Sequence, residues 1–353
     1  MRCLTLIRHG RPDFPKGQRI CLGLTDLPLS ALGRLQAALY GPFYKADRVY
    51  SSYLSRAVQT AKFIDPQPES VQGLEEMYAG AWDGLSFSEI QRRFPQLYEL
   101  RGIEPNAPIP GREELAHGQR RFFRAVSEIM ENCEGNVAIV AHATVIGSFL
   151  CKVLGLPAEE SRRFKLPYLG AYSFEYDGQF HHVKRPPLPQ VQLDGEICGR
   201  LLKAAELPKN ICAHCQAVAD EAALIGMALN RKGCNLDLEL IYCAALLHDI
   251  CRREENHAEA GAELIEQLGF GAAAEIVGQH HNLKSNCSGE AAVVFLADKL
   301  LAGTKKISIE ERFSASAEKC GSPQALQAHC RRQAQAESTA EKVENILGCK
   351  LPL

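Results

Sequence analysis

The segment Cys3-Leu4-Thr5-Leu6-Ile7-Arg8-His9-Gly10 is the part of the sequence that best predicts the fold. Its first five residues are mostly apolar, which is typical of a buried β-strand. Arg8 and His9 then stand at the carboxyl end of that strand, where ligands bind in open α/β sheets. Gly10 lets the backbone turn sharply and approach a ligand closely. The segment therefore predicts a sheet with a binding site beside its first strand.

Two further runs in the first half have the same character. They are Arg48-Val49-Tyr50 and Val137-Ala138-Ile139-Val140, and helical patterns lie between them. Strands that alternate with helices indicate a largely parallel sheet that is covered on both faces. We therefore expect an α/β domain over residues 1–183.

The organisation of the chain changes after this region. Three prolines fall within Lys184-Arg185-Pro186-Pro187-Leu188-Pro189-Gln190, so residues 184–195 are predicted to be a linker. Residues 196–353 have helical periodicity almost throughout. Within them, Ser308-Ile309-Glu310-Glu311 predicts a capping box, and Ser322-Pro323 predicts a helix start. A chain of 353 residues fits two domains of about 100–200 residues each.

Composition excludes several classes of protein. Hydrophobic residues make up 46% and charged residues 23%, which is ordinary for a globular protein and unlike a disordered or fibrous chain. The sequence contains no run of eighteen apolar residues, so no membrane span is predicted. The net charge of -2 gives no basic excess that would indicate nucleic acid or anionic lipid as a partner. The fourteen cysteines are scattered and no signal pattern precedes them, so we expect reduced thiols in a cytoplasmic protein.

Three more signals follow the first strand in order. Arg56 lies in the first turn of a helix predicted within 51–61, Leu74-Glu75-Glu76 precedes Gly80-Ala81-Trp82-Asp83-Gly84, and Val140-Ala141-His142-Ala143 ends the third strand. Each has a plain alternative, because Arg-His-Gly occurs by chance, a helical arginine is usually solvated, and a histidine after a strand can be a satisfied loop residue. Their joint occurrence in this order favours a common site.

Together with the segment Gly23–Gly33, these motifs resemble the histidine phosphatase superfamily. The resemblance covers residues 1–183 and is most evident for the small phosphatases, including those that act on α-ribazole phosphate. It implies the α/β three-layer sandwich of the phosphoglycerate mutase-like fold, with no metal or other cofactor in this domain.

The resemblance also implies the role of each site residue. His9 would attack phosphorus and form a phosphohistidine. The phosphoryl oxygens would be surrounded by three side chains, Arg8, Arg56 and His142. Glu76 would protonate the leaving oxygen and later activate water, with Glu75 as the rival for that role.

The sequence departs from the family pattern at four positions. Arg11 stands where the family usually has Glu or Gln, and Pro15 replaces a residue that is often polar. Ala141 and Ala143 flank His142 in place of Ser and Gly. Every charged group is kept, so these changes bear on the substrate more than on catalysis. Arg11 is either a further anion contact or a solvated loop residue.

The second half contains histidines and aspartates in apolar helices. His214 lies in a helical stretch, Leu246-Leu247-His248-Asp249 ends an apolar helix, and Asp298 lies within Phe295–Leu300. A carboxylate in a buried helix is costly unless it is paired or bound to a metal. Imidazoles and carboxylates that face one another from several helices are a common way to build a metal site.

This region, residues 205–303, resembles the HD superfamily of metal-dependent phosphohydrolases, an all-α helical bundle. His214, His248, Asp249 and Asp298 match its four defining ligands. The resemblance implies a divalent metal, either Mn, Fe, Zn or Mg, that lowers the pKa of bound water.

Three more histidines, His257, His280 and His281, look like the additional ligands of branches with two metals. Their alternative is a surface or capping histidine. Cys212 and Cys215 have the spacing of a zinc pair but lack a partner pair, so we expect them to pack as small hydrophobic residues beside His214.

These observations predict a bifunctional phosphohydrolase with two small-molecule substrates. The first domain would hydrolyse a phosphate monoester of a small phosphorylated metabolite, and the second a phosphoester or nucleotide. Two alternatives stay open: a mutase of the phosphoglycerate type, and a phosphatase that a non-catalytic, nucleotide-sensing HD domain regulates. The sequence predicts neither a nucleic acid nor a membrane as a partner and leaves the oligomeric state open.

Overall fold

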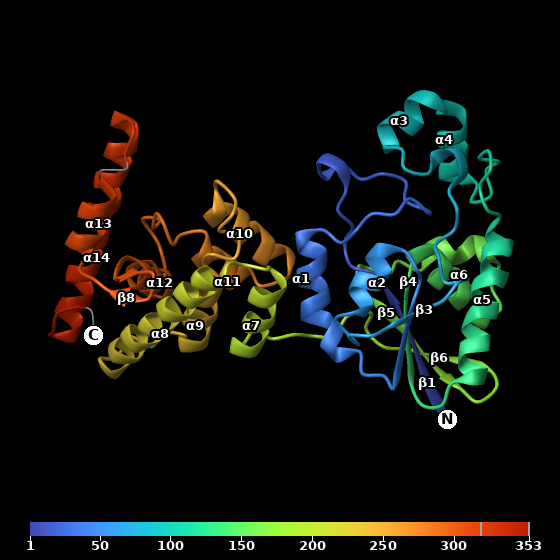
Figure 1. Cartoon of the computed structure of the whole chain (residues 1–353), viewed down its shortest axis with the longest axis horizontal. Coiled ribbons are helices and arrows are strands. Elements are labelled where there is room, and N and C mark those ends of the chain that lie inside the picture. Colours follow the sequence, from blue (N-terminus) through green and yellow to red (C-terminus); the bar gives the residue numbers. More distant parts are fainter. Residues whose placement is uncertain (318–319, 352–353) are drawn as a thin grey trace. The chain divides into compact units, whose positions relative to one another are not determined.

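The computed structural model describes residues 1–317 and 320–351 and forms two compact units (Figure 1). The first unit comprises Met1–Gln190 and the second Val191–Leu353. None of the helices in the described ranges combines the length and the apolar character that crossing a membrane requires.

A mixed six-stranded sheet forms the centre of the first unit, with the strand order β3-β2-β4-β1-β5-β6. The strands are β1 (Arg2–Arg8), β2 (Arg48–Ser51), β3 (Glu69–Ser70), β4 (Val137–Ala141), β5 (Ala171–Tyr176) and β6 (Phe180–Val183). β3, β2, β4 and β1 are parallel, so the predicted parallel strands are confirmed. β5 and β6 add an antiparallel edge, because the three-residue turn with Gly178 at φ +108° closes a hairpin.

Helices cover both faces of this sheet, as the α/β prediction required. Figure 1 shows α1 (Ala31–Tyr40) and α2 (Ser55–Ala61) on one side of the sheet, and α5 (Leu115–Asn132) and α6 (Ala143–Val153) on the other. Side chains of the central strands alternate between these two layers. In β1, Leu4 and Leu6 pack with the aromatic cluster of α5 and α6, whereas Ile7 packs toward α1 and α2.

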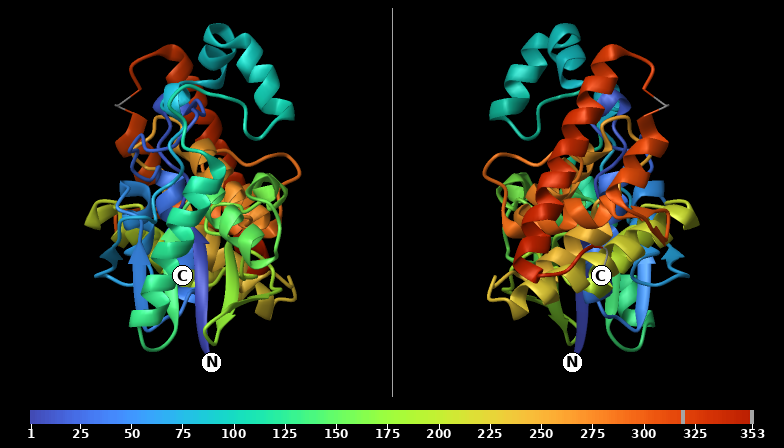
Figure 2. Two further views of the ribbon diagram at one scale, coloured as in Figure 1. Left: turned by 90° about the vertical axis from the view of Figure 1, so that its right-hand side faces the viewer. Right: turned by 90° about the vertical axis from the view of Figure 1, so that its left-hand side faces the viewer.

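The rest of the first unit consists of short helices. α3 (Phe87–Arg93) and α4 (Pro95–Ile103) lie at the far end of the unit from the N-terminus in every view (Figures 1 and 2). Short 3-10 turns complete it: η1 (Pro15–Gly17), η2 (Gly41–Phe43), η3 (Gly80–Trp82) and η4 (Ala158–Arg163). Trp82, Ile90 and Ile109 form a small apolar cluster beneath α3 and α4.

The second unit is largely helical. Its helices are α7 (Gly195–Ala204), α8 (Lys209–Arg231), α9 (Leu238–Leu247), α10 (His257–Gln267), α11 (Gly271–Val277), α12 (Gly289–Lys299), α13 (Ile309–Ala317) and α14 (Pro323–Leu347). Figure 2 shows the red α13 and α14 next to each other, in agreement with their packing contacts.

Both predicted helix starts in this unit are confirmed. Ser308 and Glu311 form a reciprocal capping box, and the Ser322 hydroxyl accepts a hydrogen bond from the backbone of Ala325. One element was not expected from the helical periodicity: a hairpin of β7 (Leu301–Ala302) and β8 (Lys305–Lys306). Gly303, at φ +62°, supplies the positive φ that its tight turn needs.

Phe149 provides a test of the aromatic core. It is fully buried, with ring centroids 5.1 Å from Phe174, 5.0 Å from Phe180 and 6.1 Å from Phe122. We expect Phe149→Ala to lower the free energy of unfolding of the first unit by about 3–5 kcal/mol, because it leaves a cavity.

The measurement is urea denaturation followed by the fluorescence of Trp82, the single tryptophan of the chain. Phe43→Ala, at a residue that is 44% exposed, is the control and should cost less than about 1 kcal/mol. Equal losses in both variants would contradict this account of the core.

Candidate active site and candidate metal centre

His9 follows the last residue of β1 and is buried. Its Nδ1 atom lies 2.7 Å from the carbonyl oxygen of Gly10. Because a carbonyl can only accept, Nδ1 must carry the proton, and Nε2 keeps its lone pair. The ring is therefore held in the tautomer that a nitrogen nucleophile requires.

Three side chains lie around His9: Arg8, Arg56 and His142. We call the four residues together the His9 pocket. The rings of His9 and His142 have their centroids 5.0 Å apart. The two arginines are fixed through backbone carbonyls. Arg56 donates to Gly23 at 2.8 Å and to Thr25 at 2.9 Å, and Arg8 donates to Leu166 at 2.6 Å.

The electrostatics of the pocket keep both histidines neutral. Burial, and after it the charges of Arg56 and Arg8, lower the pKa of His9 well below its usual range. Burial, Arg56, His9 and Arg8 do the same to the pKa of His142. The site thus combines fixed positive charge with imidazoles that still have lone pairs.

Several buried polar atoms of the pocket lack a partner among the described residues. They are both ring nitrogens of His142 and the Nε atoms of Arg8 and Arg56. Buried polar groups in native proteins are nearly always hydrogen-bonded. These atoms, together with the two guanidinium charges, suit an anion as a ligand.

Glu76 and Glu75 differ in their surroundings. The buried carboxylate of Glu76 accepts hydrogen bonds from the backbone of Thr144 at 3.1 Å and of Val145 at 3.3 Å, in the first turn of α6. That turn begins directly after His142. Glu75 instead pairs with Arg121 at 2.9 Å. Glu76 is therefore the carboxylate beside the His9 pocket.

Sequence reasoning missed the residue that supports Arg56. The carboxylate of Asp83 accepts hydrogen bonds from the backbone of Gly23, Leu24 and Thr25 at 3.1, 2.7 and 3.2 Å. Asp83 therefore fixes the loop whose carbonyls hold the Arg56 guanidinium. The only sequence signal was its place in the Gly80–Gly84 segment, which gives no hint of a partner about 60 positions earlier.

Gly10 lies close to another part of the backbone. A Cβ atom at this position would lie 2.7 Å from the backbone oxygen of Gly33 in α1. This close approach requires glycine at position 10.

The second unit brings six of the seven predicted metal ligands into two groups. The first triad is His214 from α8, His248 directly after α9, and Asp298 from α12, with ligand atoms within 4.8 Å of one another. Nδ1 of His214 donates to the Gly303 carbonyl at 2.8 Å, and Nδ1 of His248 donates to the Ala245 carbonyl at 2.7 Å. Both Nε2 atoms therefore face Asp298, at 3.2 and 3.9 Å from its Oδ1.

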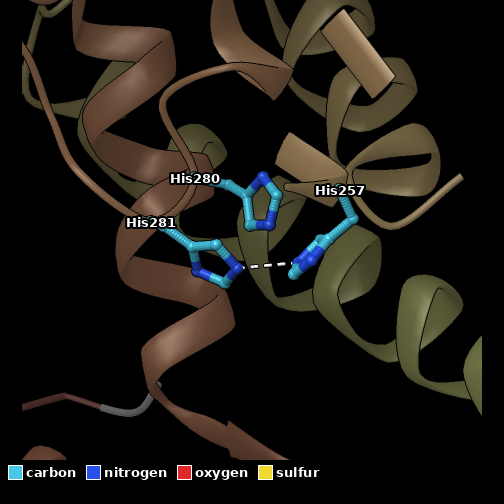
Figure 3. A group of neighbouring side chains, drawn as sticks. All are labelled: His257, His280 and His281. Carbon is cyan, nitrogen blue, oxygen red and sulfur yellow. Dashed lines mark hydrogen bonds between the residues drawn. The ribbon is translucent and has the colours of Figure 1, made fainter. Parts of the chain in front are cut away.

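The second triad is His257, His280 and His281 (Figure 3). His257 is the first residue of α10, and the other two lie in the turn after α11. The Nε2 atoms of His257 and His281 are 2.7 Å apart, and Figure 3 shows the rings gathered around a common point. Neither His280 nor His281 is a surface residue, since one is buried and the other half-buried.

Asp249 is the seventh predicted ligand and lies between the triads. One of its oxygens is 3.6 Å from Nε2 of His248 in the first triad. The other is 3.3 Å from Nε2 of His257 and 3.7 Å from Nε2 of His280 in the second. A single carboxylate therefore connects the two groups.

Unpaired buried atoms test whether a cation fits here. Nε2 of His248, Nε2 of His280 and Oδ1 of Asp249 have no hydrogen-bond partner among the described residues. Burial by itself would raise the pKa of Asp298, but Lys299, His214 and the neighbouring histidines outweigh it and hold the pKa well below its usual range. Imidazole and ionised carboxylate donors suit a divalent metal ion, so these clusters fit a divalent metal site.

The β7–β8 hairpin supports the first triad. Besides the bond from His214 to Gly303, the ammonium of Lys306 lies 2.7 Å from the buried carboxylate of Glu221. Glu221 is two turns along α8 from His214, so both contacts fix the hairpin against one face of that helix. Cys215 is buried and Cys212 half-buried, and neither triad contains a cysteine.

These features describe two candidate sites: a positively charged pocket at the edge of a mixed α/β sheet where parallel strands end, and a histidine-aspartate cluster in a largely helical unit. The chain belongs to the histidine phosphatase superfamily (branch 1), whose sequence pattern matches residues 4–186. That of the HD domain matches residues 211–303. Both are families of phosphoric ester hydrolases.

Individual relatives support this assignment. The chain is 32% identical over 163 residues to the uncharacterized phosphatase PhoE of Bacillus subtilis, covering 44% of this chain and 79% of that one. It is 29% identical over 220 residues to the probable phosphoglycerate mutase GpmB of Yersinia pestis, covering 53% and 97%. Other curated relatives, the 6-phosphofructo-2-kinase/fructose-2,6-bisphosphatases, are spanned over only 35–36% of their length.

Among solved structures, YhfR of Bacillus stearothermophilus is 26% identical, with a TM-score of 0.47. The match covers 52% of this chain and 95% of that one.

The lowered pKa values of His9 and His142 predict how stability depends on pH. The unfolded chain protonates both histidines near pH 6.5, whereas the folded unit does so only at lower pH. The free energy of unfolding is therefore not reduced by these two histidines above pH 6.5. It falls with decreasing pH below that value, by up to about 1.4 kcal/mol per pH unit for each histidine.

Urea denaturation at pH 7.5, 6.5 and 5.5 measures this slope. His142→Gln should reduce it by about one histidine's share, whereas Phe43→Ala, which removes no titratable group, should leave it unchanged. An identical slope in wild type and His142→Gln would show that His142 is not held neutral.

Proposed function

We propose that the first unit hydrolyses a phosphate monoester of a small metabolite through a phosphohistidine at His9. The observation that carries this proposal is the Nε2 lone pair of a buried, neutral His9 beside the buried guanidinium of Arg56 and the half-buried Arg8. A phosphoryl group in transfer spreads negative charge over its equatorial oxygens, and fixed cations stabilise that charge. Membership of the histidine phosphatase superfamily supports the same chemistry.

The proposed reaction has two steps. In the first, Nε2 of His9 bonds to phosphorus, the ester P–O bond breaks, and protonated Glu76 gives its proton to the leaving oxygen. In the second, Glu76 accepts a proton from water, the water oxygen bonds to phosphorus, and the P–N bond to His9 breaks. Arg8, Arg56 and His142 surround the phosphoryl oxygens in both steps, and Asp83 acts indirectly by positioning Arg56.

We further propose that the second unit is a divalent-metal phosphohydrolase. His214, His248, Asp249 and Asp298 would hold one ion, and His257, His280 and His281 would hold a second with Asp249 between them. When bound, such an ion supplies Lewis-acid activation of water and of a phosphoester. Lys299, whose ammonium lies 2.6 Å from Oδ2 of Asp298, would keep that carboxylate oriented and ionised.

The similarity to a probable phosphoglycerate mutase favours a second candidate for the first unit. A phosphohistidine can return its phosphoryl group to the substrate instead of transferring it to water. Incubation with 3-phosphoglycerate distinguishes the two: a mutase yields the 2-isomer, whereas a phosphatase yields glycerate and inorganic phosphate.

The nucleophile is tested with p-nitrophenyl phosphate as a general monoester. His9→Ala should abolish its hydrolysis, because no other group can accept the phosphoryl group in the proposed mechanism. Arg56→Lys should lower kcat/KM, because an ammonium cannot reproduce the paired contacts of a guanidinium. The fall should correspond to a loss of about 2–4 kcal/mol of transition-state stabilisation.

The control is His181→Ala, a substitution at an exposed histidine of the same unit, and it should leave the rate unchanged. Far-UV circular dichroism checks that each variant is folded. Full activity of His9→Ala would remove the proposed mechanism.

The metal site is tested by elemental analysis of the purified protein. The double variant His248→Ala/Asp249→Ala should contain almost no divalent metal, because it removes a ligand of the first triad and the carboxylate that connects both triads. Monoester hydrolysis by the first unit should be unaffected. EDTA should likewise abolish the activity of the second unit and leave monoester hydrolysis intact.

His329→Gln is the matched control, since His329 is a buried histidine of the same unit that bonds to Ser316 and belongs to neither triad. Unchanged metal content in the double variant would count against the site. Nucleotide binding without turnover by the metal-loaded protein would favour the regulatory alternative for this unit.

A further inference from the structure

A cavity of about 430 Å³ lies beside the His9 pocket. Arg8 and Thr144 form part of its wall, which connects it to the pocket and to the first turn of α6. The wall continues through the segment 161–167, which contributes Arg162 and Lys165. A substrate whose phosphate occupies the His9 pocket would extend its remaining atoms into this cavity.

A second cavity of about 200 Å³ shares two wall residues with the first, Thr144 and Arg162. Its wall also contains Glu76 and two further arginines, Arg101 and Arg112. Arg162 therefore lines both cavities, and Glu76 lies in the wall of the second.

The charges along both walls are strongly unequal. Besides Arg8, they include four basic residues, Arg101, Arg112, Arg162 and Lys165. The single acidic residue is Glu76, which already has a role in the proposed reaction. Neither Arg162 nor Lys165 takes part in any ion pair found within residues 1–317 and 320–351.

The neighbouring Arg163 shows that the lack of an ion pair is not a general property of the segment 161–167. Arg163 pairs with Glu160 at 2.8 Å and lines neither cavity. Arg162 instead donates to the carbonyl of Arg101 at 2.9 Å, which ties η4 to α4 and leaves the charge of Arg162 uncompensated. A second contact between the same regions, from Asn106 to Glu159 at 2.7 Å, fixes the position of η4.

We propose that Arg162 and Lys165 form a subsite for a second anionic group on the substrate, either a carboxylate or another phosphate. The inference rests on the proposed function, since it places the scissile phosphate in the His9 pocket. A guanidinium can bind a carboxylate or phosphate through two parallel hydrogen bonds, and Lys165 adds a point charge to the same wall. Esters of uncharged alcohols leave both cations without a partner and are therefore poorer substrates.

The test uses phosphonates of matched size as inhibitors of p-nitrophenyl phosphate hydrolysis by the full chain. Propylphosphonate carries one anionic group, 2-carboxyethylphosphonate adds a carboxylate, and ethane-1,2-diphosphonate adds a second phosphonate. We expect at least one doubly anionic compound to have an inhibition constant about tenfold lower than that of propylphosphonate, as one charge-assisted contact provides. The doubly anionic compound with the lower inhibition constant identifies the second anion as a carboxylate or a phosphate.

Arg162→Gln should reduce this advantage to less than about threefold, because the side chain keeps its size and loses its charge. Arg163→Gln is the control and should retain the full advantage. Lys165→Gln gives a second, independent variant if Arg162→Gln does not fold, and it should also diminish the advantage.

Equal inhibition by all three phosphonates would overturn the subsite, as would an advantage that survives both Arg162→Gln and Lys165→Gln. These outcomes differ from failure of the proposed function. In that case wild type would not hydrolyse p-nitrophenyl phosphate, or His9→Ala would do so as well as wild type.

Discussion

The buried guanidinium of Arg56 is the interaction on which the first unit's site depends. A charge with no exposed surface is tolerated only where hydrogen bonds surround it, and the Gly23 and Thr25 carbonyls provide them. Asp83 in turn holds that loop through three backbone N–H groups. Burial, and after it the fixed charge of Arg56, keeps His9 and His142 neutral. A single buried cation thus binds the loop and contributes to the neutral state of both imidazoles.

In the second unit, hydrogen bonds hold the histidines and carboxylates in an arrangement that suits a cation. Backbone carbonyls take the Nδ1 protons of His248 and His280, so the Nε2 lone pairs of these two rings face the interior of the cluster. Lys299 lies against Asp298, whose carboxylate stays ionised although it is buried. The first unit therefore concentrates positive charge around a pocket suited to an anion, and the second concentrates lone pairs and carboxylates suited to a cation.

The ends of secondary structure elements place these groups. Arg8 ends β1, and His142 lies between β4 and α6, so two adjacent parallel strands bring their following residues to one edge of the sheet. His248 and Asp249 follow α9 in the same manner. Reactive side chains at such ends are held by rigid elements on one side and are free on the other to face a ligand.

The sequence alone determined the architecture of both halves and most residues of the two candidate sites. Strand periodicity predicted β1, β2 and β4, and ordered motifs indicated His9, Arg56, Glu76 and His142, because these signals are local or depend on residue type. Only the tertiary structure separated Arg162 from Arg163, since adjacent residues point in different directions and sequence does not say which one lines a cavity. The support from Asp83, the position of Asp249 between the triads and the β7–β8 hairpin also required the fold, because each depends on contacts between segments far apart in the chain.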